Sequence, residues 1–491
     1  MAIDPRTPVL VGAGVAHQRL DDPAAALEAV DLMAAASEQA GADAGAPGLL
    51  AAIDSVFVPR GTWRYPDPGR LLATRFGASG ARSVIAELGV LQQTLFTRAC
   101  VGIADGSVDV ALVVGGEAKY RDLRARITGT AALDVTQPED ARPDESLAPA
   151  SEIIPRPEID AGLISAPLQY SVLETGLRAA RGDSVAEDAA ATAELWSAFS
   201  RVAAENPDAW RREPVAPDFL SHPSARNPML AAPYTKWHCS QWNVDQAAAF
   251  ILCSSDAADR AGVPADRRVY PLAAVESNDM VPISRRAHLD RAPAARVGAE
   301  QLAALTGNDV SAADHVDLYS CFPVAVRIQA AELGLSTDRA LTVTGGMTFG
   351  GGPLNNYTFQ SLAKMVEVLR RAPGTTGLVS CISGMITKHG MALWSTRPSD
   401  SGFRFVDTSA ETAARTETLD LVTDYSGPAV VDGYTVAHDQ GAPVYAAALA
   451  HTPDGARCAA RTDDAELAAL MVDEEWVGRP IAVDGSRFTD A

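Results

Sequence analysis

The strongest constraint on the fold is an order of elements that the chain uses twice. In each copy, a helical pattern stands between two apolar runs that predict strands: residues 53–59, 92–104 and 108–116, then 315–322, 355–371 and 375–384. Strands that are apolar throughout and alternate with helices are typical of a parallel sheet covered on both faces. The two copies therefore predict an α/β protein with two sheets of mostly parallel strands.

Corresponding residues of the two copies lie 263 positions apart, from Asp54 to Asp317 and from Gly89 to Gly352. One unit repeated at a fixed separation indicates duplicated halves that pack face to face. We expect Asp54 and Asp317 to occupy equivalent strands of these halves.

Two further segments differ from the halves in residue composition and in the pattern of their apolar runs. Residues 121–240 are rich in Pro, Asp and Arg and predict a loop domain, since an insertion of this length must form a subdomain or a lid. Residues 399–491 contain short alternating runs broken by Gly, Pro and Asp, which predict a small all-β barrel of the OB-like kind. The expected domains are therefore 1–120, 121–240, 241–398 and 399–491, and a cut near Ser399 should leave a folded body.

Charge and composition exclude several classes of function. The net charge of −21 argues against nucleic acid as a partner, because phosphates would be repelled. Residues 402–491 hold sixteen acidic and six basic residues, the wrong sign for an oligonucleotide-binding barrel. The six cysteines are scattered, so they indicate neither a zinc site nor a redox pair. No apolar stretch is long enough to span a bilayer, and we expect a cytoplasmic protein without a metal or resident cofactor.

Several glycine-rich and helix-flanking motifs carry a resemblance to a known family. Residues 103–120 (IADGSVDVALVVGGEAKY), 243–263 (NVDQAAAFILCSSDAADRAGV) and 345–353 (GGMTFGGGP) are similar to motifs of the thiolase superfamily. The stretches 61–73 (GTWRYPDPGRLLA) and 317–326 (DLYSCFPVAV) resemble its thiolase-like proteins of type 1, relatives of the sterol-carrier-type thiolases with an added C-terminal domain. The resemblance implies a five-layer αβαβα fold built from the two halves.

The same resemblance identifies positions where thiolases carry out chemistry. The nucleophilic cysteine of the family falls on Gly89, seventeen residues before Gly106. The histidine of its Gly-His-Pro motif falls on Gly352, and the Asn or His that holds a catalytic water falls on Tyr319. Only Cys381 matches a catalytic residue, so the resemblance implies that the thiolase cycle cannot run.

Other polar residues lie near these motifs in the sequence. Ser240 matches the serine that contacts the pantetheine of coenzyme A, while Lys388 and His389 follow the Cys381 segment and offer groups for different chemistry. We expect Asn355 and Asn356 to cap the helix that they open. The remaining expectations are structural: Cys100 in the core, and Trp237 and Trp242 in the core of the loop domain.

The favoured hypothesis is a thiolase-like protein that binds an acyl-CoA or related thioester without thiolase activity. An alternative is an enzyme of another acyl-CoA reaction of lipid or steroid metabolism, of the aldolase, hydratase or hydrolase type, using Tyr319, Cys381, Lys388 or His389. A third is a scaffold with a vestigial site, in which the C-terminal barrel recruits a protein partner. The expected small-molecule ligand is acyl-CoA, and the expected oligomeric state is a monomer or homodimer.

Overall fold

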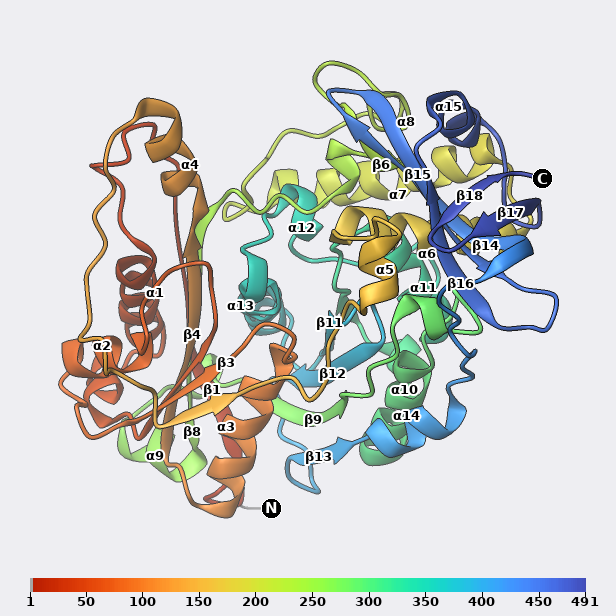
Figure 1. Ribbon diagram of the computed structural model, residues 1–491. Helices are drawn as coiled ribbons and strands as arrows, with labels where there is room; N and C mark the ends of the chain where they lie inside the picture. The colour runs from red at the N-terminus through yellow and green to blue at the C-terminus, as the bar shows by residue number, and fades with distance from the viewer. Residues whose placement is uncertain (1–2) are drawn as a thin grey trace.

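Two central sheets and the helices that cover them form the body of the protein. The structure is a computed structural model, and it describes residues 3–491. Helix α1 covers the outer face of the first sheet, α3 and α13 lie between the sheets, and α10 covers the second sheet, as the contacts between these elements show (Figure 1). This is the five-layer αβαβα arrangement that was expected.

The first sheet has the order β1-β8-β4-β2-β3-β5. Its strands are β1 (Pro8–Gln18), β8 (Asp245–Ser254), β4 (Val110–Ala118), β2 (Ser55–Pro59), β3 (Arg82–Ala86) and β5 (Glu145–Leu147). The helices of this half are α1 (Ala29–Asp43), η1 (Pro47–Ala52), α2 (Pro68–Arg75), α3 (Gln93–Asp105), α4 (Lys119–Thr128) and α9 (Ser255–Arg260).

The second sheet has the order β10-β11-β12-β9-β13. Its strands are β10 (His315–Asp317), β11 (Thr376–Ser383), β12 (Lys388–Ser395), β9 (Tyr270–Ser277) and β13 (Arg404–Asp407). Its helices are η3 (Ala265–Arg267), η4 (Ile283–Arg285), α10 (Pro293–Thr306), η5 (Val310–Ala312), α11 (Pro323–Glu332), α12 (Gly346–Phe349), η6 (Leu354–Asn356), α13 (Tyr357–Arg371) and α14 (Ser409–Arg415).

The halves are duplicates in strand order and direction. The run β1-β8-β4-β2 matches β9-β12-β11-β10, and in both runs two antiparallel pairings are followed by a parallel one. The strands of each sheet are mostly parallel, as expected, and a single strand runs antiparallel to its neighbours: β8 in the first sheet and β12 in the second. The duplication also corrects a boundary: β8 falls in the range 241–398 that was expected for the second half, but it lies between β1 and β4 of the first sheet.

The expectation that Asp54 and Asp317, which are 263 positions apart, occupy equivalent places in the two halves is wrong. The Asp54 carboxylate accepts hydrogen bonds from the backbone N–H groups of Asp109 and Val110 at 2.8 and 2.9 Å, just where β4 begins. In the second half, the Asp314 carboxylate accepts a hydrogen bond at 2.8 Å from the backbone N–H of Thr376, where β11 begins. Asp317 instead ends β10 and accepts from the backbone N–H of Val343, so Asp314 is the equivalent of Asp54.

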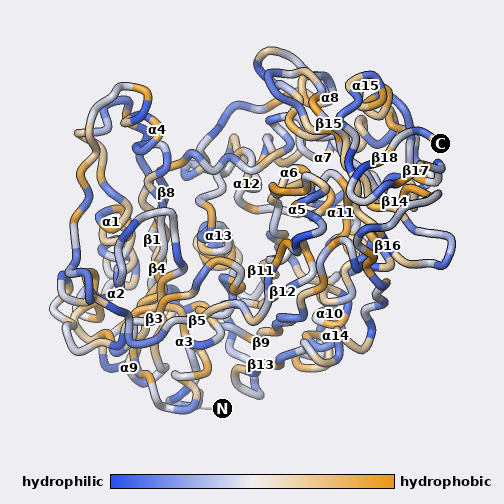
Figure 2. The backbone as a smooth tube through the Cα atoms, viewed as in Figure 1, coloured by the Kyte–Doolittle hydropathy of each residue, from blue (hydrophilic) through white to orange (hydrophobic). Residues whose placement is uncertain are grey.

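The central layer contains the core shared by both sheets. Helix α3 contacts β4 and β8 on one side and β9 and β12 on the other. Its buried aromatic Phe96 packs edge-on against Phe250 and Phe359, and Cys100, 1% exposed, lies in the same core as expected. Figure 2 shows hydrophobic residues concentrated along the central strands and hydrophilic residues on the outer loops.

The segment expected as a loop domain has mixed structure and reaches both neighbouring parts of the molecule. It contains α5 (Arg156–Asp160), α6 (Ala166–Arg181), α7 (Val185–Glu205), α8 (Pro217–Ser221), β6 (Met229–Ala232), β7 (Tyr234–Thr235) and η2 (Lys236–His238). Upstream of these, β5 pairs with β3 and covers the edge of the first sheet. Strand β6 pairs with β14 of the C-terminal domain.

The C-terminal domain is a closed barrel of five strands. These are β14 (Ser426–Asp439), β15 (Ala442–His451), β16 (Arg457–Thr462), β17 (Pro480–Asp484) and β18 (Arg487–Asp490), and α15 (Ala465–Asp473) packs on β15. The barrel begins later than expected, because β13 still pairs with β9 of the second sheet. A cut at Ser399 would therefore remove one strand of the body, which corrects the expected truncation point.

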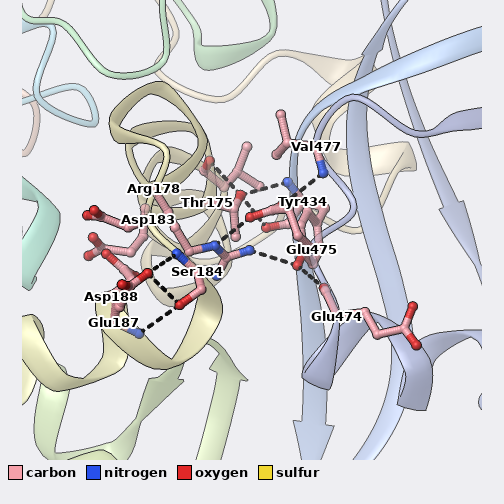
Figure 3. A network of polar contacts seen from close by, with 12 residues as sticks. Thr175, Arg178, Asp183, Ser184, Glu187, Asp188, Tyr434, Glu474, Glu475 and Val477 are labelled. Atoms are coloured by element: carbon pink, nitrogen blue, oxygen red, sulfur yellow. Dashed lines mark hydrogen bonds and ion pairs between the residues drawn. The ribbon is translucent and has the colours of Figure 1, made fainter.

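The barrel is docked on α6 through a network of polar contacts (Figure 3). The Arg178 side chain is 2% exposed, and it donates to Glu475 at 2.7 Å and to the Tyr434 hydroxyl at 2.8 Å. The Thr175 hydroxyl also accepts from the backbone N–H of Tyr434 at 2.9 Å. Because these groups are buried or half-buried, the barrel is an integral part of the fold.

Among residues 3–491, no helix is both long and apolar enough to cross a membrane. Over the same residues, His, Cys, Asp and Glu side chains form no group of three or more arranged to hold a metal ion.

Candidate functional site

A cavity of about 620 Å³ brings together segments from both halves and from the loop domain. Gly89, Tyr319, Gly352 and Ser240 all line it, although they are far apart in the sequence. Most of the other lining side chains are apolar: Leu88, Val90, Ile153, Tyr170, Leu230, Trp242, Phe322, Met347, Leu354, Ile382 and Met385. Cys381, Lys388 and His389 are not among the lining residues.

Gly89 lies in the turn between β3 and α3, where its backbone conformation suits glycine alone. Its φ is +96°, a region that side chains rarely adopt. A Cβ at this position would lie 3.1 Å from the Ile153 Cδ1 atom and from the Pro149 Cγ atom. The carbonyl oxygen of Gly89 points to the second half, where it accepts from the Lys388 Nζ atom at 3.2 Å and the Ser383 hydroxyl at 3.4 Å.

Gly352 lies in the loop that precedes η6 and α13, and its backbone is ordinary. Its N–H donates to the Gln241 carbonyl oxygen at 2.9 Å, and a Cβ here would lie 3.2 Å from the Met347 Cε atom. The neighbouring Gly351 has a φ of +107°, and a Cβ there would clash with the Gln246 side chain at 2.1 Å. Glycine is thus required at 351 and only permitted at 352.

Tyr319 presents its phenol to the cavity from the loop after β10. Its ring packs at 90° against that of Tyr357, with centroids 5.4 Å apart, and its hydroxyl accepts from the Gln92 side chain at 3.4 Å. Burial raises the pKa of Tyr319 well above its usual value, and the nearby thiols of Cys321 and Cys381 add to the shift. The group therefore remains a neutral phenol at physiological pH.

The thiols near the cavity are all protonated at neutral pH. Cys381 lies in the fully buried part of β11, and burial raises its pKa to about 11 although the Thr358 hydroxyl and the start of α3 favour the thiolate. Cys321 lines the cavity with a pKa raised to about 12 by burial, and burial also raises the pKa of Cys239. A thiol becomes a nucleophile only as the thiolate, so none of the three is activated.

Comparisons with known proteins bear on the fold and on the C-terminal domain. Residues 410–486 match the family model described as the thiolase-like protein type 1 additional C-terminal domain. A monomeric SCP2-thiolase-like protein type 1 from Mycobacterium smegmatis has the same structure over 100% of both chains, with 28% identity and a TM-score of 0.84. The chain has a thiolase fold extended by the C-terminal domain of type 1 thiolase-like proteins.

More distant structures share the fold of this thiolase-like protein. The dimeric peroxisomal thiolase of Saccharomyces cerevisiae is 16% identical, with a TM-score of 0.54 over 81% of this chain and 99% of its own. The Acat5 thiolase of Ascaris suum, in complex with coenzyme A, is also 16% identical, with a TM-score of 0.54 over 79% of this chain and 99% of its own. Comparison with curated proteins found no match.

Ser240 lies in the wall of the cavity. Its hydroxyl donates to the Cys321 carbonyl oxygen at 2.9 Å, and its Cβ would be the neighbour of any side chain at position 352. A hydroxyl that already donates one hydrogen bond can still accept one from a ligand.

Lys388 and His389 lie behind the cavity wall, on β12. Both side chains are 2% exposed. Burial lowers the pKa of Lys388, and it lowers the pKa of His389 to about 3, so the imidazole is neutral. The His389 Nε2 atom lies 3.2 Å from the Gln329 side-chain oxygen, which places this ring in a buried network away from the cavity.

The structure corrects three expectations about neighbouring residues. Asn356 is at the N-cap position of α13 but does not cap it; its side chain donates instead to the Gly115 carbonyl oxygen at 3.1 Å and ties the helix to β4. Asn355 does not cap the helix either, since it lies within η6 and lines the cavity. Trp237 is partly buried in the core as expected, but Trp242 is 49% exposed at the cavity.

Two features of the site could not be found from local sequence patterns. The Asn355 side chain is 9% exposed, and its amide nitrogen has no hydrogen-bond partner within residues 3–491. The run Gly384–Met385–Ile386 has φ values of 59°, 52° and 68°, and its first two residues line the cavity. Left-handed backbone at non-glycine residues is costly and gathers at functional sites. The glycine before Met385 is the only local hint of this loop.

Proposed function

We propose that this thiolase-like protein binds an acyl thioester of coenzyme A in the cavity and does not carry out thiolysis. The observation that carries the proposal is a cavity of about 620 Å³ in which the positions of the family nucleophile and base, 89 and 352, are both glycine. In this proposal, the cavity has room for an acyl group, and the nucleophile and base of the family are absent.

The chemistry of the lining residues supports the loss of thiolysis. Thiolysis needs a thiolate nucleophile and a group that moves a proton at the α-carbon of the substrate. The two thiols that line the cavity, Cys239 and Cys321, have pKa values raised by burial. Tyr319 is a neutral phenol, which donates a hydrogen bond and does not act as a base at neutral pH.

The mainly apolar lining supports the binding of an acyl group. Ligand sites of this size are typically apolar with a few polar groups that orient the ligand. Here the free amide of Asn355, the phenol of Tyr319 and the hydroxyl of Ser240 are the polar groups on the wall. Two of them can donate to a thioester oxygen, and the third can accept from an amide N–H of pantetheine.

Thiolysis is tested with acetoacetyl-CoA and free coenzyme A, and it is followed by the loss of the absorbance of the acetoacetyl enolate as two molecules of acetyl-CoA form. Removing one member of a cooperating catalytic set can lower the rate by ~10⁶-fold, so we expect no measurable turnover. An active thiolase assayed in parallel serves as the control. Robust cleavage by the purified protein would contradict the interpretation of Gly89 and Gly352.

Binding is tested separately by calorimetry with octanoyl-CoA. We expect saturable binding of one molecule, weakened at least tenfold (about 1.4 kcal/mol) by Gly352→Leu, whose side chain fills the cavity. Gly48→Leu is the matched control, because Gly48 is exposed and a Cβ there has no neighbour within 4 Å. Absence of any binding would favour a scaffold in which the acidic barrel recruits a protein partner.

A second candidate function is hydrolysis of a thioester, and one contact favours it. Ser383 lines the cavity and is paired across the strands with Lys388, whose buried amine has a lowered pKa. Both side chains donate to the same Gly89 carbonyl oxygen. The lowered pKa of Lys388 favours loss of its proton, and the deprotonated amine accepts the serine proton as the serine oxygen attacks the thioester carbon. The amine then returns this proton to the sulfur, and coenzyme A leaves as the thiol. Water then hydrolyses the serine ester to the free acid.

Release of free thiol from octanoyl-CoA discriminates between the two candidates. The binding proposal expects none beyond the rate without protein. Thiol release that disappears in Ser383→Ala and in Lys388→Met, but persists in Ser401→Ala on the exposed surface, would establish the hydrolase instead.

A further inference from the structure

A second, smaller cavity lies next to the strained loop but on its other side. It has a volume of about 200 Å³ and shares no lining residue with the large cavity. Gly384 and Met385 line the large cavity, whereas Ile386 and Thr387 line the small one. The left-handed loop is therefore the wall between the two.

The small cavity contains a buried arginine without an acidic partner. Arg286 is 5% exposed, and its guanidinium donates to the carbonyl oxygens of Val281 and Gly384, each at 3.0 Å. No carboxylate of residues 3–491 forms an ion pair with it. Glu158 attracts it from a distance, but that carboxylate is already bound by the backbone N–H and hydroxyl of Ser284.

Arg286 keeps its charge in this environment. Burial lowers its pKa to about 10, which still leaves it protonated at neutral pH. A buried charge that faces only neutral carbonyl groups is costly, and a bound anion relieves that cost.

The start of helix α10 faces the same cavity. Pro293 and Ala294 line it, and the helix has 14 residues. Its N-cap residue, Ala292, has no side chain that could accept from the first turn. Pro293 has no N–H, and the Ala295 N–H donates to the Ala292 carbonyl oxygen at 2.9 Å, so the Ala294 N–H is the free donor of this turn. With the partial positive charge of the helix start, it favours an anion.

Thr412 supplies an independent sign of a missing ligand. It lines the cavity from α14, is 2% exposed, and its hydroxyl has no hydrogen-bond partner within residues 3–491. Buried hydroxyl groups are almost always paired. This one is free to donate to an anion in the cavity.

The other charged groups around the cavity are balanced by neighbours. Arg291 pairs with Glu332 at 2.6 Å, and Arg415 pairs with Glu300 at 2.6 Å. His288 lies 3.4 Å from Glu417, and both of these side chains are mostly exposed. The unpaired charge of the site is therefore that of Arg286.

We propose that this cavity binds a small oxyanion of the phosphate class, held by the Arg286 guanidinium, the first turn of α10 and the Thr412 hydroxyl. The volume equals that of about seven water molecules at ~30 Å³ each, which accommodates a phosphate group but not a nucleotide. Because Arg286 also holds the Gly384 carbonyl oxygen, the anion stabilises the loop that separates the two cavities. The proposal shares no residue with the acyl-binding proposal and stands without it.

Calorimetric titration of the full-length protein with inorganic phosphate, against chloride at matched ionic strength, tests the site. We expect one saturable site, weakened at least tenfold by Arg286→Met, because the variant loses the charge-assisted hydrogen bonds of the guanidinium to the anion. Thr412→Val replaces the hydroxyl by a methyl group of equal size, and it should weaken binding several-fold without loss of folding. Arg285→Met removes an adjacent exposed arginine and should leave binding unchanged.

Absence of saturable phosphate binding by the wild-type protein would overturn the proposal. Equal binding by the wild type, Arg286→Met and Thr412→Val would also overturn it. Acetate that binds as tightly as phosphate would exclude the phosphate class. Titration with glycerol 3-phosphate identifies the source: affinity equal to or above that of phosphate indicates a phosphate carried by a larger molecule, and much weaker binding indicates free phosphate.

Discussion

Substitution of Gly89 by alanine tests whether the backbone at position 89 disfavours any side chain. The φ of +96° costs a non-glycine residue roughly 1–3 kcal/mol. The new Cβ also lies 3.1 Å from Ile153 Cδ1 and Pro149 Cγ, so these atoms must move by a few tenths of an ångström. Reduced freedom of the unfolded chain offsets about 0.4–1 kcal/mol. The expected net loss in the free energy of unfolding is about 1–2 kcal/mol.

The same substitution at Gly352 should be nearly neutral. Its φ is not positive, so an added Cβ meets crowding without backbone strain: Met347 Cε lies at 3.2 Å, and the Met347 and Ser240 Cβ atoms lie at 3.3 Å. We expect a change within about 0.5 kcal/mol. Gly182→Ala separates strain from crowding, because Gly182 has a φ of +73° and a Cβ there has no neighbour within 4 Å.

Urea unfolding of the wild type and the three alanine variants, followed by far-ultraviolet circular dichroism, measures these differences. The expected order of destabilisation is Gly89→Ala first, then Gly182→Ala, with Gly352→Ala last. Equal destabilisation at 89 and 352 would refute the reasoning. If this order is observed, a cysteine at position 89 would have the same unfavourable φ. A single substitution of Gly89 by cysteine would then also destabilise the protein.

Three further predictions concern the rest of the molecule. Arg178→Met should lower the free energy of unfolding by about 2–3 kcal/mol. This loss is smaller than for a fully buried pair, because Glu475 is 34% exposed and can be hydrated. An unchanged midpoint of urea unfolding would contradict a role of Arg178 in docking the barrel. Burial raises the pKa of Glu276 from 4.5 to about 7, so the stability that it contributes is complete below pH 4.5 and is lost as the pH rises through 7. The Glu276→Gln variant should therefore gain stability relative to wild type by about 1 kcal/mol per pH unit across that window, and parallel pH profiles of the two proteins would exclude the shift. Alkylation of Cys239 and Cys321 by iodoacetamide at pH 7.5, followed by mass spectrometry, should be much slower than that of free cysteine, and rapid labelling of either would reveal an activated thiol.

The fold was largely predictable because its signals are local. Apolar runs and helical periodicity depend on neighbouring residues, so the repeated order of strand, helix and strand indicated two similar halves. The glycines at 89 and 352 were also identified from sequence motifs, and the structure places both in one cavity with Tyr319 and Ser240.

The errors concern contacts between distant segments. Strand β8 follows the loop domain in the sequence, but its edge hydrogen bonds are completed by β1 and β4, so it belongs to the first sheet. The Asn356 side chain satisfies a strand carbonyl instead of its own helix. In both cases, a nonlocal partner competed successfully with the local one.

The amino-acid sequence alone determined the types of the main elements, the duplicated plan, the acidity of the C-terminal domain and the glycines at positions 89 and 352. The tertiary structure decided which side chains share a cavity, that Trp242 is exposed, and that Arg286 is buried without an acidic partner. Secondary structure follows from the spacing of residues along the chain, whereas a cavity and an unpaired charge arise only when segments hundreds of residues apart are packed together.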